Sequence, residues 1–169
     1  MNSSNVSFSL HSWNVRGLGD NNKCILVRDV VSSACPKTAS FQETKLCNID
    51  HLKVCSFLPA NLNEFQYTDA DDTRGGILTA WDSSIFSLTS SFTRQHSLMM
   101  ILSSTASDYS FAVTNVYAPS NHRDSSSFLE SLEDIASHAS EGWTLAGDFN
   151  LTRDSSENNN GTSNANLSY

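Results

Sequence analysis

The chain has 169 residues, 38% of them hydrophobic, a length that suits one domain with a core of its own. Its net charge of −8 at pH 7 argues against tight nucleic-acid binding by these residues alone, because DNA-binding surfaces usually carry an excess of basic side chains. No apolar run approaches the roughly 20 residues that span a bilayer, and the first residues do not form a signal peptide. We therefore expect an intracellular protein, nuclear or cytoplasmic, with no membrane contact.

The first half of the chain predicts two strands and two helices. Alternating apolar residues predict a strand over 6–13, and a second strand is predicted over 38–42. A helix is predicted over 22–34, with an asparagine available as its N-cap and Pro36 beyond its end. Its apolar stripe consists of Leu26, Val27, Val30, Val31 and Ala34. Residues 50–58 form either a short helix or an irregular turn.

From residue 64 onward the pattern changes to short strands. Strands are predicted over 77–81, 84–93, 97–104 and 109–117, and the polar breaks between them favour antiparallel hairpins. The four cysteines, none of them in a C-x-x-C pair, are expected to be reduced and mostly buried thiols: Cys24, Cys35, Cys47 and Cys55.

The clearest helix is predicted over 124–140, where Phe128, Leu132, Ile135 and Ala139 share one face. Ser127 and Glu130 have the spacing of a capping box. A buried strand follows over 143–149. Residues 152–169 are almost entirely polar and are expected to form a disordered tail, because they cannot bury enough apolar surface to order themselves.

Three side chains that carry oxygen atoms follow predicted strands: Asn14, Glu43 and Asp148. They could meet at one rim of a sheet, where open α/β sheets place their ligands. Mg²⁺ prefers such hard oxygen ligands and keeps several waters, so one or two carboxylates suffice. Taken singly, each residue is equally typical of an ordinary turn or a helix cap.

Taken together, the motifs resemble the endonuclease/exonuclease/phosphatase family. They follow the family order: Trp13-Asn14-Val15-Arg16-Gly17, Gln42-Glu43-Thr44-Lys45, Gly75-Gly76, Asn115-Val116-Tyr117-Ala118-Pro119 and Gly147-Asp148-Phe149-Asn150. The closest resemblance is to the endonuclease domain of plant LINE-type (non-LTR) retrotransposons. It implies an α/β (α+β) fold, a four-layer αββα sandwich of two mainly antiparallel sheets, incomplete at the C-terminus. The domain would span residues 6–151.

The resemblance also implies roles for five residues. Glu43 and Asn14 match the metal-binding pair, with Mg²⁺ as the ion and Mn²⁺ as the alternative. Tyr117 matches a tyrosine beside the scissile phosphate, Asp148 an aspartate that orients or deprotonates the attacking water, and Asn150 an asparagine that holds the phosphate. The implied activity is hydrolysis of phosphodiesters with DNA as substrate. The net acidic charge is compatible with it, because a bound metal reverses the local field. No obligate protein partner is evident.

The closing Ser-Asp-His motif of the family is absent. All five histidines precede Gly147: His11, His51, His96, His122 and His138. We therefore expect one sheet with its helices and only the start of the other sheet, with inner apolar faces partly uncovered and negligible hydrolysis. Arg16 and Lys45 could contact phosphate, although lone basic loop residues are more often solvated.

Two alternatives stay open beside the nuclease. One is a non-catalytic remnant of a retroelement or a truncated gene product, which keeps the motifs without the chemistry. The other is a phosphatase of the same family that acts on lipid or RNA phosphoesters. The reading frame beyond Tyr169 would discriminate between the nuclease and the remnant.

Overall fold

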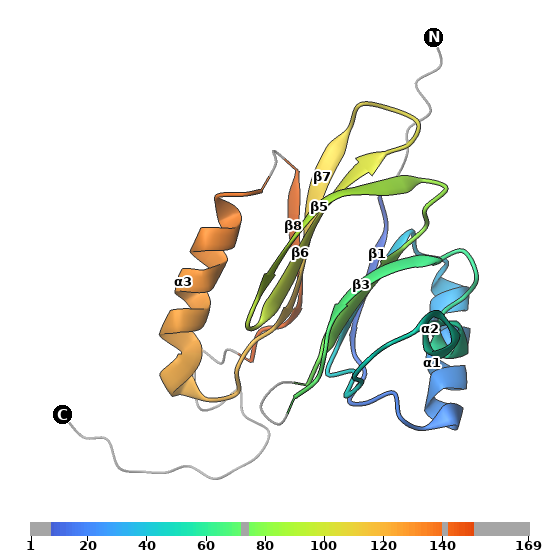
Figure 1. Cartoon of the computed structure of the whole chain (residues 1–169), viewed down its shortest axis with the longest axis horizontal. Helices are drawn as coiled ribbons and strands as arrows, with labels where there is room; N and C mark the ends of the chain where they lie inside the picture. The colour runs from blue at the N-terminus through green and yellow to red at the C-terminus, as the bar shows by residue number, and fades with distance from the viewer. Residues whose placement is uncertain (1–7, 72–74, 140–141, 151–169) are drawn as a thin grey trace, which may run out of the picture.

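The computed structural model describes residues 8–71, 75–139 and 142–150. Two four-stranded sheets pack face to face, with α3 (Ser125–Ala136) outside one sheet and α1 (Asn21–Ala34) and α2 (His51–Phe57) outside the other (Figure 1). The four-layer α+β sandwich predicted from the sequence is thereby confirmed. The expectation of one sheet and only the start of the other is wrong, because the second sheet contains four strands, as many as the first. None of the helices in the described ranges is long and apolar enough to cross a membrane.

The first sheet has the strand order β1-β2-β4-β3. Strand β1 (Leu10–Asn14) runs parallel to β2 (Thr38–Gln42), and β4 (Ile77–Trp81) is antiparallel to both β2 and β3 (Glu64–Thr68). Every residue of β2 and β4 is buried, as expected for central strands covered on both faces. The strand predicted over 6–13 begins later, at Leu10, and residues 1–7 lie outside the described part.

The helix predicted over 22–34 is confirmed, but its cap and its buried face differ from the prediction. The N-cap is Asp20, whose carboxylate accepts the Lys23 N–H at 3.0 Å, and not an asparagine. The buried face consists of Cys24, Val27 and Val31. Leu26 and Val30, predicted to be buried, are 57% and 37% exposed, because only a narrow stripe of α1 contacts the sheet.

The segment 50–58 is the short helix α2, capped at its start by Asp50 and at its end by Leu58. All four cysteines are free thiols, of which only Cys24 is buried. The expectation of buried thiols is therefore wrong for the other three, which lie on exposed helix positions and loops: Cys35, Cys47 and Cys55.

The second sheet has the order β5-β6-β7-β8. Strands β5 (Phe86–Arg94), β6 (Ser97–Ser104) and β7 (Ser110–Tyr117) form an antiparallel meander, which confirms the predicted hairpins, and β8 (Trp143–Asp148) is parallel to β7. The predicted hairpin between β4 and β5 is wrong, because these consecutive strands belong to different sheets.

Helix α3 follows a short 3₁₀ turn, η1 (His122–Asp124), and buries Phe128 and Ile135 against this sheet. The predicted capping box is wrong. Asp124 is the N-cap without a side-chain hydrogen bond, and the hydroxyl of Ser127 donates to the Asp124 carbonyl at 3.0 Å.

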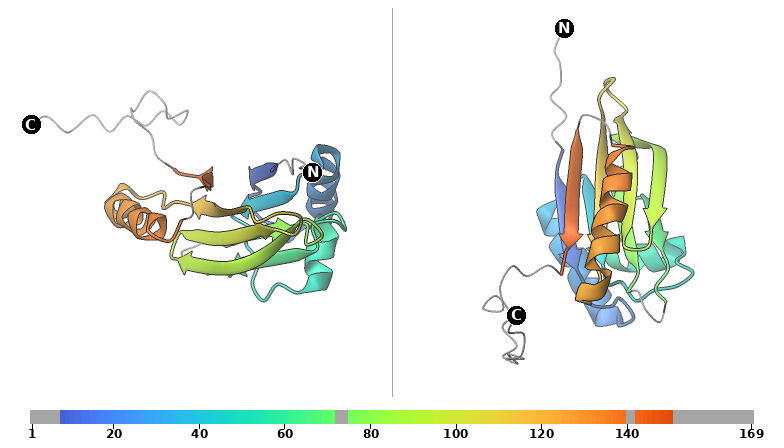
Figure 2. Two further views of the ribbon diagram at one scale, coloured as in Figure 1. Left: turned by 90° about the horizontal axis from the view of Figure 1, so that it is seen from above. Right: turned by 90° about the vertical axis from the view of Figure 1, so that its left-hand side faces the viewer.

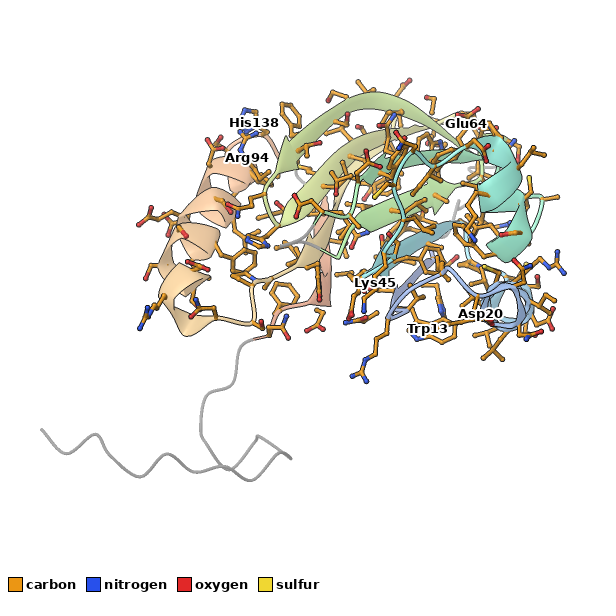
Figure 3. All side chains as sticks on the ribbon, turned by 60° about the horizontal axis from the view of Figure 1, so that its bottom comes forward. Trp13, Asp20, Lys45, Glu64, Arg94 and His138 are labelled. Carbon is orange, nitrogen blue, oxygen red and sulfur yellow. The ribbon has the colours of Figure 1, made fainter. Side chains whose placement is uncertain are left out.

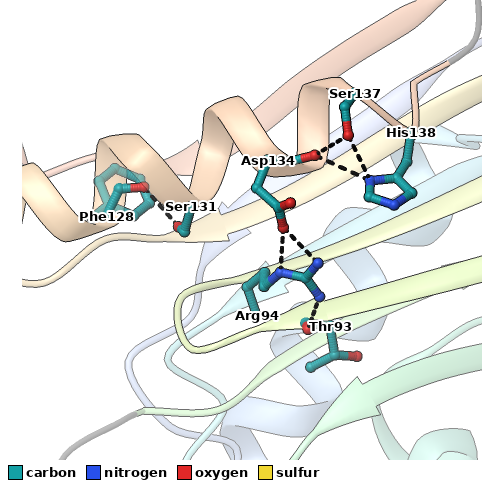
Figure 4. Close-up of polar contacts among 7 residues, drawn as sticks. All are labelled: Thr93, Arg94, Phe128, Ser131, Asp134, Ser137 and His138. Atoms are coloured by element: carbon teal, nitrogen blue, oxygen red, sulfur yellow. Dashed lines mark hydrogen bonds and ion pairs between the residues drawn. The ribbon is translucent and has the colours of Figure 1, made fainter.

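The helix also ends earlier than residue 140. Ser137 Oγ and His138 Nδ1 lie 2.6 and 3.0 Å from the Asp134 carbonyl oxygen, which the next helical turn would otherwise use (Figure 4). The Asp134 carboxylate pairs with Arg94 at the end of β5, with Oδ2 2.8 Å from Nε. This exposed pair ties the end of α3 to the sheet that it covers.

Candidate active site at the strand ends

The carboxyl ends of β1, β2, β7 and β8 lie at one rim of the sandwich. Both views in Figure 2 place β1 and β8, the edge strands of their two sheets, at the same margin. Asn14 Nδ2 donates to Asp148 Oδ2 at 2.7 Å, which joins the end of one sheet to the end of the other. The rim therefore brings together two of the residues predicted for the site, although they are separated by most of the chain.

Asn14 and Asp148 are each held by the turn that follows them. Asn14 Oδ1 accepts the backbone N–H of Arg16 at 3.2 Å, and Asp148 Oδ1 accepts that of Asn150 at 3.1 Å. Asn and Asp favour this conformation, because their short side chains reach the backbone two residues on. The second oxygen of Asp148 is the one that contacts Asn14.

Left-handed backbone conformations gather at the rim. Glu43 has a φ of 55°, and three other non-glycine residues at strand ends also have a positive φ: Arg16, Lys45 and Asn150. Such residues are uncommon outside glycine, and clusters of them are typical of functional sites. The backbone around Glu43 is held by hydrogen bonds on both sides, with Gly17 N–H donating to its carbonyl at 2.6 Å and Lys45 N–H donating to Gly75 at 2.7 Å.

Gly75 makes a close approach that a larger residue could not make. A Cβ at this position would lie 2.8 Å from Glu43 Cγ and 2.9 Å from Tyr117 Cε1. The two side chains therefore meet over the bare backbone of Gly75. This contact brings Tyr117, from the second sheet, beside Glu43, from the first.

The hydroxyl of Tyr117 lies within the electrostatic influence of the Glu43 carboxylate. Burial raises the pKa of Tyr117 above its ordinary value of 10.0, and the negative charges of Glu43 and Asp148 raise it further, whereas Arg16 opposes them. The phenol is therefore protonated at neutral pH and is available as a hydrogen-bond donor.

Lys45 contacts the same carboxylate, with Nζ 3.1 Å from Glu43 Oε1. Its side chain is 60% exposed, so the pair is weak and readily exchanged for another cation. An open hollow of about 530 Å³ lies at the end of β1, and its lining includes Asn14, Asp148 and Trp13. Figure 3 looks toward this rim, with Lys45 and Trp13 labelled at it.

The donor atoms at the rim suit a divalent cation with hard oxygen ligands. Two carboxylates and an amide oxygen, from Glu43, Asp148 and Asn14, match what Mg²⁺ needs when waters complete its shell. Within residues 8–71, 75–139 and 142–150, no group of three or more His, Cys, Asp and Glu side chains could hold a metal. The ammonium group of Lys45 already pairs with the Glu43 carboxylate, so a positive charge is bound at this position.

Asn150 and the histidines contribute less to the rim than the other residues. Asn150 Nδ2 donates to the Ala118 carbonyl at 2.7 Å, so this amide is bound to the backbone. Four histidine side chains are described, and their contacts involve neither Glu43 nor Asp148. These contacts are His11 with Trp13, His51 with Phe65, His96 with the Tyr117 carbonyl and Phe128, and His138 with Phe92, the Ser137 hydroxyl and the Asp134 carbonyl.

Two functional candidates escaped the sequence prediction, Gln42 and Asn115. Both are buried polar side chains between the sheets, 1% and 0% exposed. The sequence carries a signal for Asn115, because this polar amide lies in a buried part of β7. Asn115 also shares its strand face with Tyr117.

Neither protein-family models nor curated protein sequences match this chain. Solved structures do match it, each over 86% of this chain. D. rerio TDP2 complexed with a single-strand DNA product matches at 19% sequence identity and a TM-score of 0.63, over 61% of its own chain. The human Nocturnin catalytic domain with bound sulfate matches at 14% identity and a TM-score of 0.61 over 64% of its chain, and ANGEL2, a 2′,3′-cyclic phosphatase, at 17% identity and a TM-score of 0.63 over 53% of its chain. These proteins have the endonuclease/exonuclease/phosphatase fold, and this chain shares it. The chain spans between about half and two thirds of their lengths.

Proposed function

We propose that the rim is the active site of a divalent-metal-dependent phosphoester hydrolase that acts on nucleic acid. The observation that carries this proposal is the convergence of Asn14, Glu43, Tyr117 and Asp148 from both sheets. The fold supports it as well, because its structural neighbours include a protein complexed with a DNA product and a cyclic phosphatase. The resemblance of the motifs to plant LINE-type endonucleases favours DNA nicking.

Each residue has a distinct task in this proposal. Glu43 and Asn14 would hold Mg²⁺, with Mn²⁺ as an alternative, and the Lys45 ammonium would release the Glu43 carboxylate for this purpose. When bound, the ion neutralises charge on the nonbridging oxygens of the phosphate. Tyr117, kept protonated by its surroundings, donates a hydrogen bond to a phosphate oxygen. Asp148 orients a water molecule for attack.

Asn14 has a second task, because its Nδ2 fixes one carboxylate oxygen of Asp148 at 2.7 Å. Among the described residues, the other oxygen accepts a hydrogen bond only from the Asn150 backbone N–H, at 3.1 Å, and it has lone pairs left for a water molecule. Asn150 supports the same turn, and its amide would have to leave the Ala118 carbonyl to donate to a phosphate oxygen.

We also propose that hydrolysis by the 169 residues alone is negligible. General acid–base assistance contributes about 10²–10⁴ in rate, and no described histidine side chain contacts Glu43 or Asp148. Nicking of supercoiled plasmid in Mg²⁺ measures the remaining rate. Clear nicking that disappears in Glu43→Ala would contradict this proposal of negligible turnover, while supporting the site.

The substrate class is tested by binding of a fluorescent single-stranded DNA oligonucleotide, which slow turnover leaves intact. We expect added Mg²⁺ to tighten binding to the wild-type chain and to have no effect on Glu43→Gln, because Glu43 would hold the ion, whose charge would favour a phosphate at the rim. Glu64→Gln, at an exposed position at the start of β3, is the matched control and should respond like wild type. Binding that is indifferent to Mg²⁺ would overturn the proposal, and displacement by a phosphomonoester instead of DNA would favour a phosphatase.

A further inference from the structure

A buried amide bridge joins the two sheets just inside the rim. Gln42 Nε2 of β2 donates to Asn115 Oδ1 of β7 at 2.7 Å. Asn115 Nδ2 in turn lies within hydrogen-bond distance of the backbone carbonyls of Phe41, at 3.2 Å, and Leu78, at 3.0 Å, and of Thr79 Oγ1, also at 3.0 Å. One amide of the second sheet is therefore bonded to both central strands of the first sheet.

This bridge differs in kind from the apolar packing between the sheets, and it lies deeper than the Asn14–Asp148 hydrogen bond at the rim, which is only partly buried. An apolar cluster packs between the sheets: Trp81, Phe86, Met100, Leu102, Phe111 and Val113. Apolar packing has little directional preference, so it tolerates small sliding of one sheet over the other. Hydrogen bonds in a buried site are directional and strong, and each unmade one is costly, so they fix a single placement.

The bridge lies next to the two residues that meet at the rim. Gln42 directly precedes Glu43, and Asn115 precedes Tyr117 by two positions, on the same face of β7. Glu43 and Tyr117 come from different sheets, and their contact over Gly75 leaves no spare space. Their mutual placement thus depends on how the two sheets are aligned.

We propose that Gln42 and Asn115 are positioning residues, which align the two sheets so that Glu43 and Tyr117 form one site. The proposal rests on the function proposed above for that site. Ser12 extends the bridge to β1, since its hydroxyl oxygen lies 3.2 Å from Gln42 Nε2, close to Asn14. The three strands that supply the metal pair and the phenol are thereby connected through one pair of amides.

The test must separate alignment from stability. Asn115→Leu leaves the Gln42 amide buried without its partner, so this variant is expected to melt at a much lower temperature. The double variant Gln42→Leu/Asn115→Leu removes both partners with little change of volume, and stability is expected to recover toward wild type. Alignment by hydrogen bonds is not restored in the double variant.

Two readouts are measured on the folded double variant. The first is Mn²⁺ affinity, expected to weaken by about 10–100-fold, as is typical when a residue behind a metal ligand is lost. The second is the NMR nuclear Overhauser effect between the Tyr117 ring and Gly75 Hα, expected to be lost. Thr114→Val is the control: it removes a partly buried hydrogen bond of β7, which Trp143 Nε1 donates at 2.9 Å, without touching the bridge. It should change neither readout.

The outcomes are distinguishable. A double variant that keeps wild-type Mn²⁺ affinity and the Tyr117–Gly75 contact would overturn the positioning role, and loss of both supports it. If the wild-type chain binds no Mn²⁺, the proposed function fails, and the Tyr117–Gly75 contact alone tests the positioning role. A double variant that retains this contact would overturn the positioning role, and a double variant that loses it would support that role.

Discussion

Replacing Gly75 by alanine perturbs the site without removing any of its functional groups. The added methyl would lie 2.8 Å from Glu43 Cγ, 2.9 Å from Tyr117 Cε1 and 3.0 Å from the backbone of Glu43. That backbone is held in place, because Gly17 N–H donates to the Glu43 carbonyl and the N–H of the neighbouring Lys45 donates to the Gly75 carbonyl. The clash therefore has to be relieved by moving the Glu43 and Tyr117 side chains apart.

The size of the effect follows from this geometry. Forcing one extra methyl group into a filled site typically costs about 1–3 kcal/mol. For a domain of this size that cost corresponds to a decrease in melting temperature of about 2–12 °C. Metal affinity is expected to decrease as well, since Glu43 is displaced from its partners at the rim.

Thermal unfolding followed by circular dichroism measures the first effect, and Gly19→Ala provides the control. A Cβ at Gly19 has no heavy atom within 4 Å, so that variant should melt close to wild type, although both replace glycine by alanine in a loop. If Gly75→Ala and Gly19→Ala melt at the same temperature, the close approach of Glu43 and Tyr117 over Gly75 is refuted.

Two further predictions concern Tyr117 and the cap of α1. The folded-state pKa of Tyr117 is raised, so the stability that this phenol contributes is complete below pH 10.0 and is lost as the pH rises through the folded-state pKa. Tyr117→Phe should therefore lose less stability than wild type above pH 10.0 in denaturant titrations, and equal losses would contradict the shift. Asp20→Ala removes the carboxylate that caps α1 and should lower the free energy of unfolding by about 1 kcal/mol. A change of only a few tenths would show that the cap contributes little.

Much of the fold was predictable because several elements carry local patterns. The strands over 38–42 and 77–81 are buried throughout and the strand over 97–104 is mostly buried, and the structure has all three at the predicted bounds. Sheet membership was not predictable, because β4 and β5 follow each other in sequence and pair with different partners. Pairing is decided by long-range contacts that no local pattern encodes.

The candidate site was predictable to a similar extent. Asn14, Glu43 and Asp148 follow strands, and the sequence places them at strand ends, where the structure brings them to one rim. The ion pair of Glu43 with Lys45 was not predicted, because it depends on a left-handed φ at both residues. The bridge between Gln42 and Asn115 was missed for another reason: its partners lie in different sheets and 73 positions apart.

The central claim is that the rim binds a divalent cation through Glu43. Electron paramagnetic resonance of free Mn²⁺, titrated against the wild-type chain and Glu43→Gln, tests it without requiring turnover. We predict a single Mn²⁺ site in the wild-type chain that weakens by at least about tenfold in Glu43→Gln, because an amide cannot replace the carboxylate charge. Glu64→Gln, whose exposed side chain lies at the opposite end of the sheet, should bind like wild type. Equal Mn²⁺ affinity of the wild-type chain and Glu43→Gln would contradict the account.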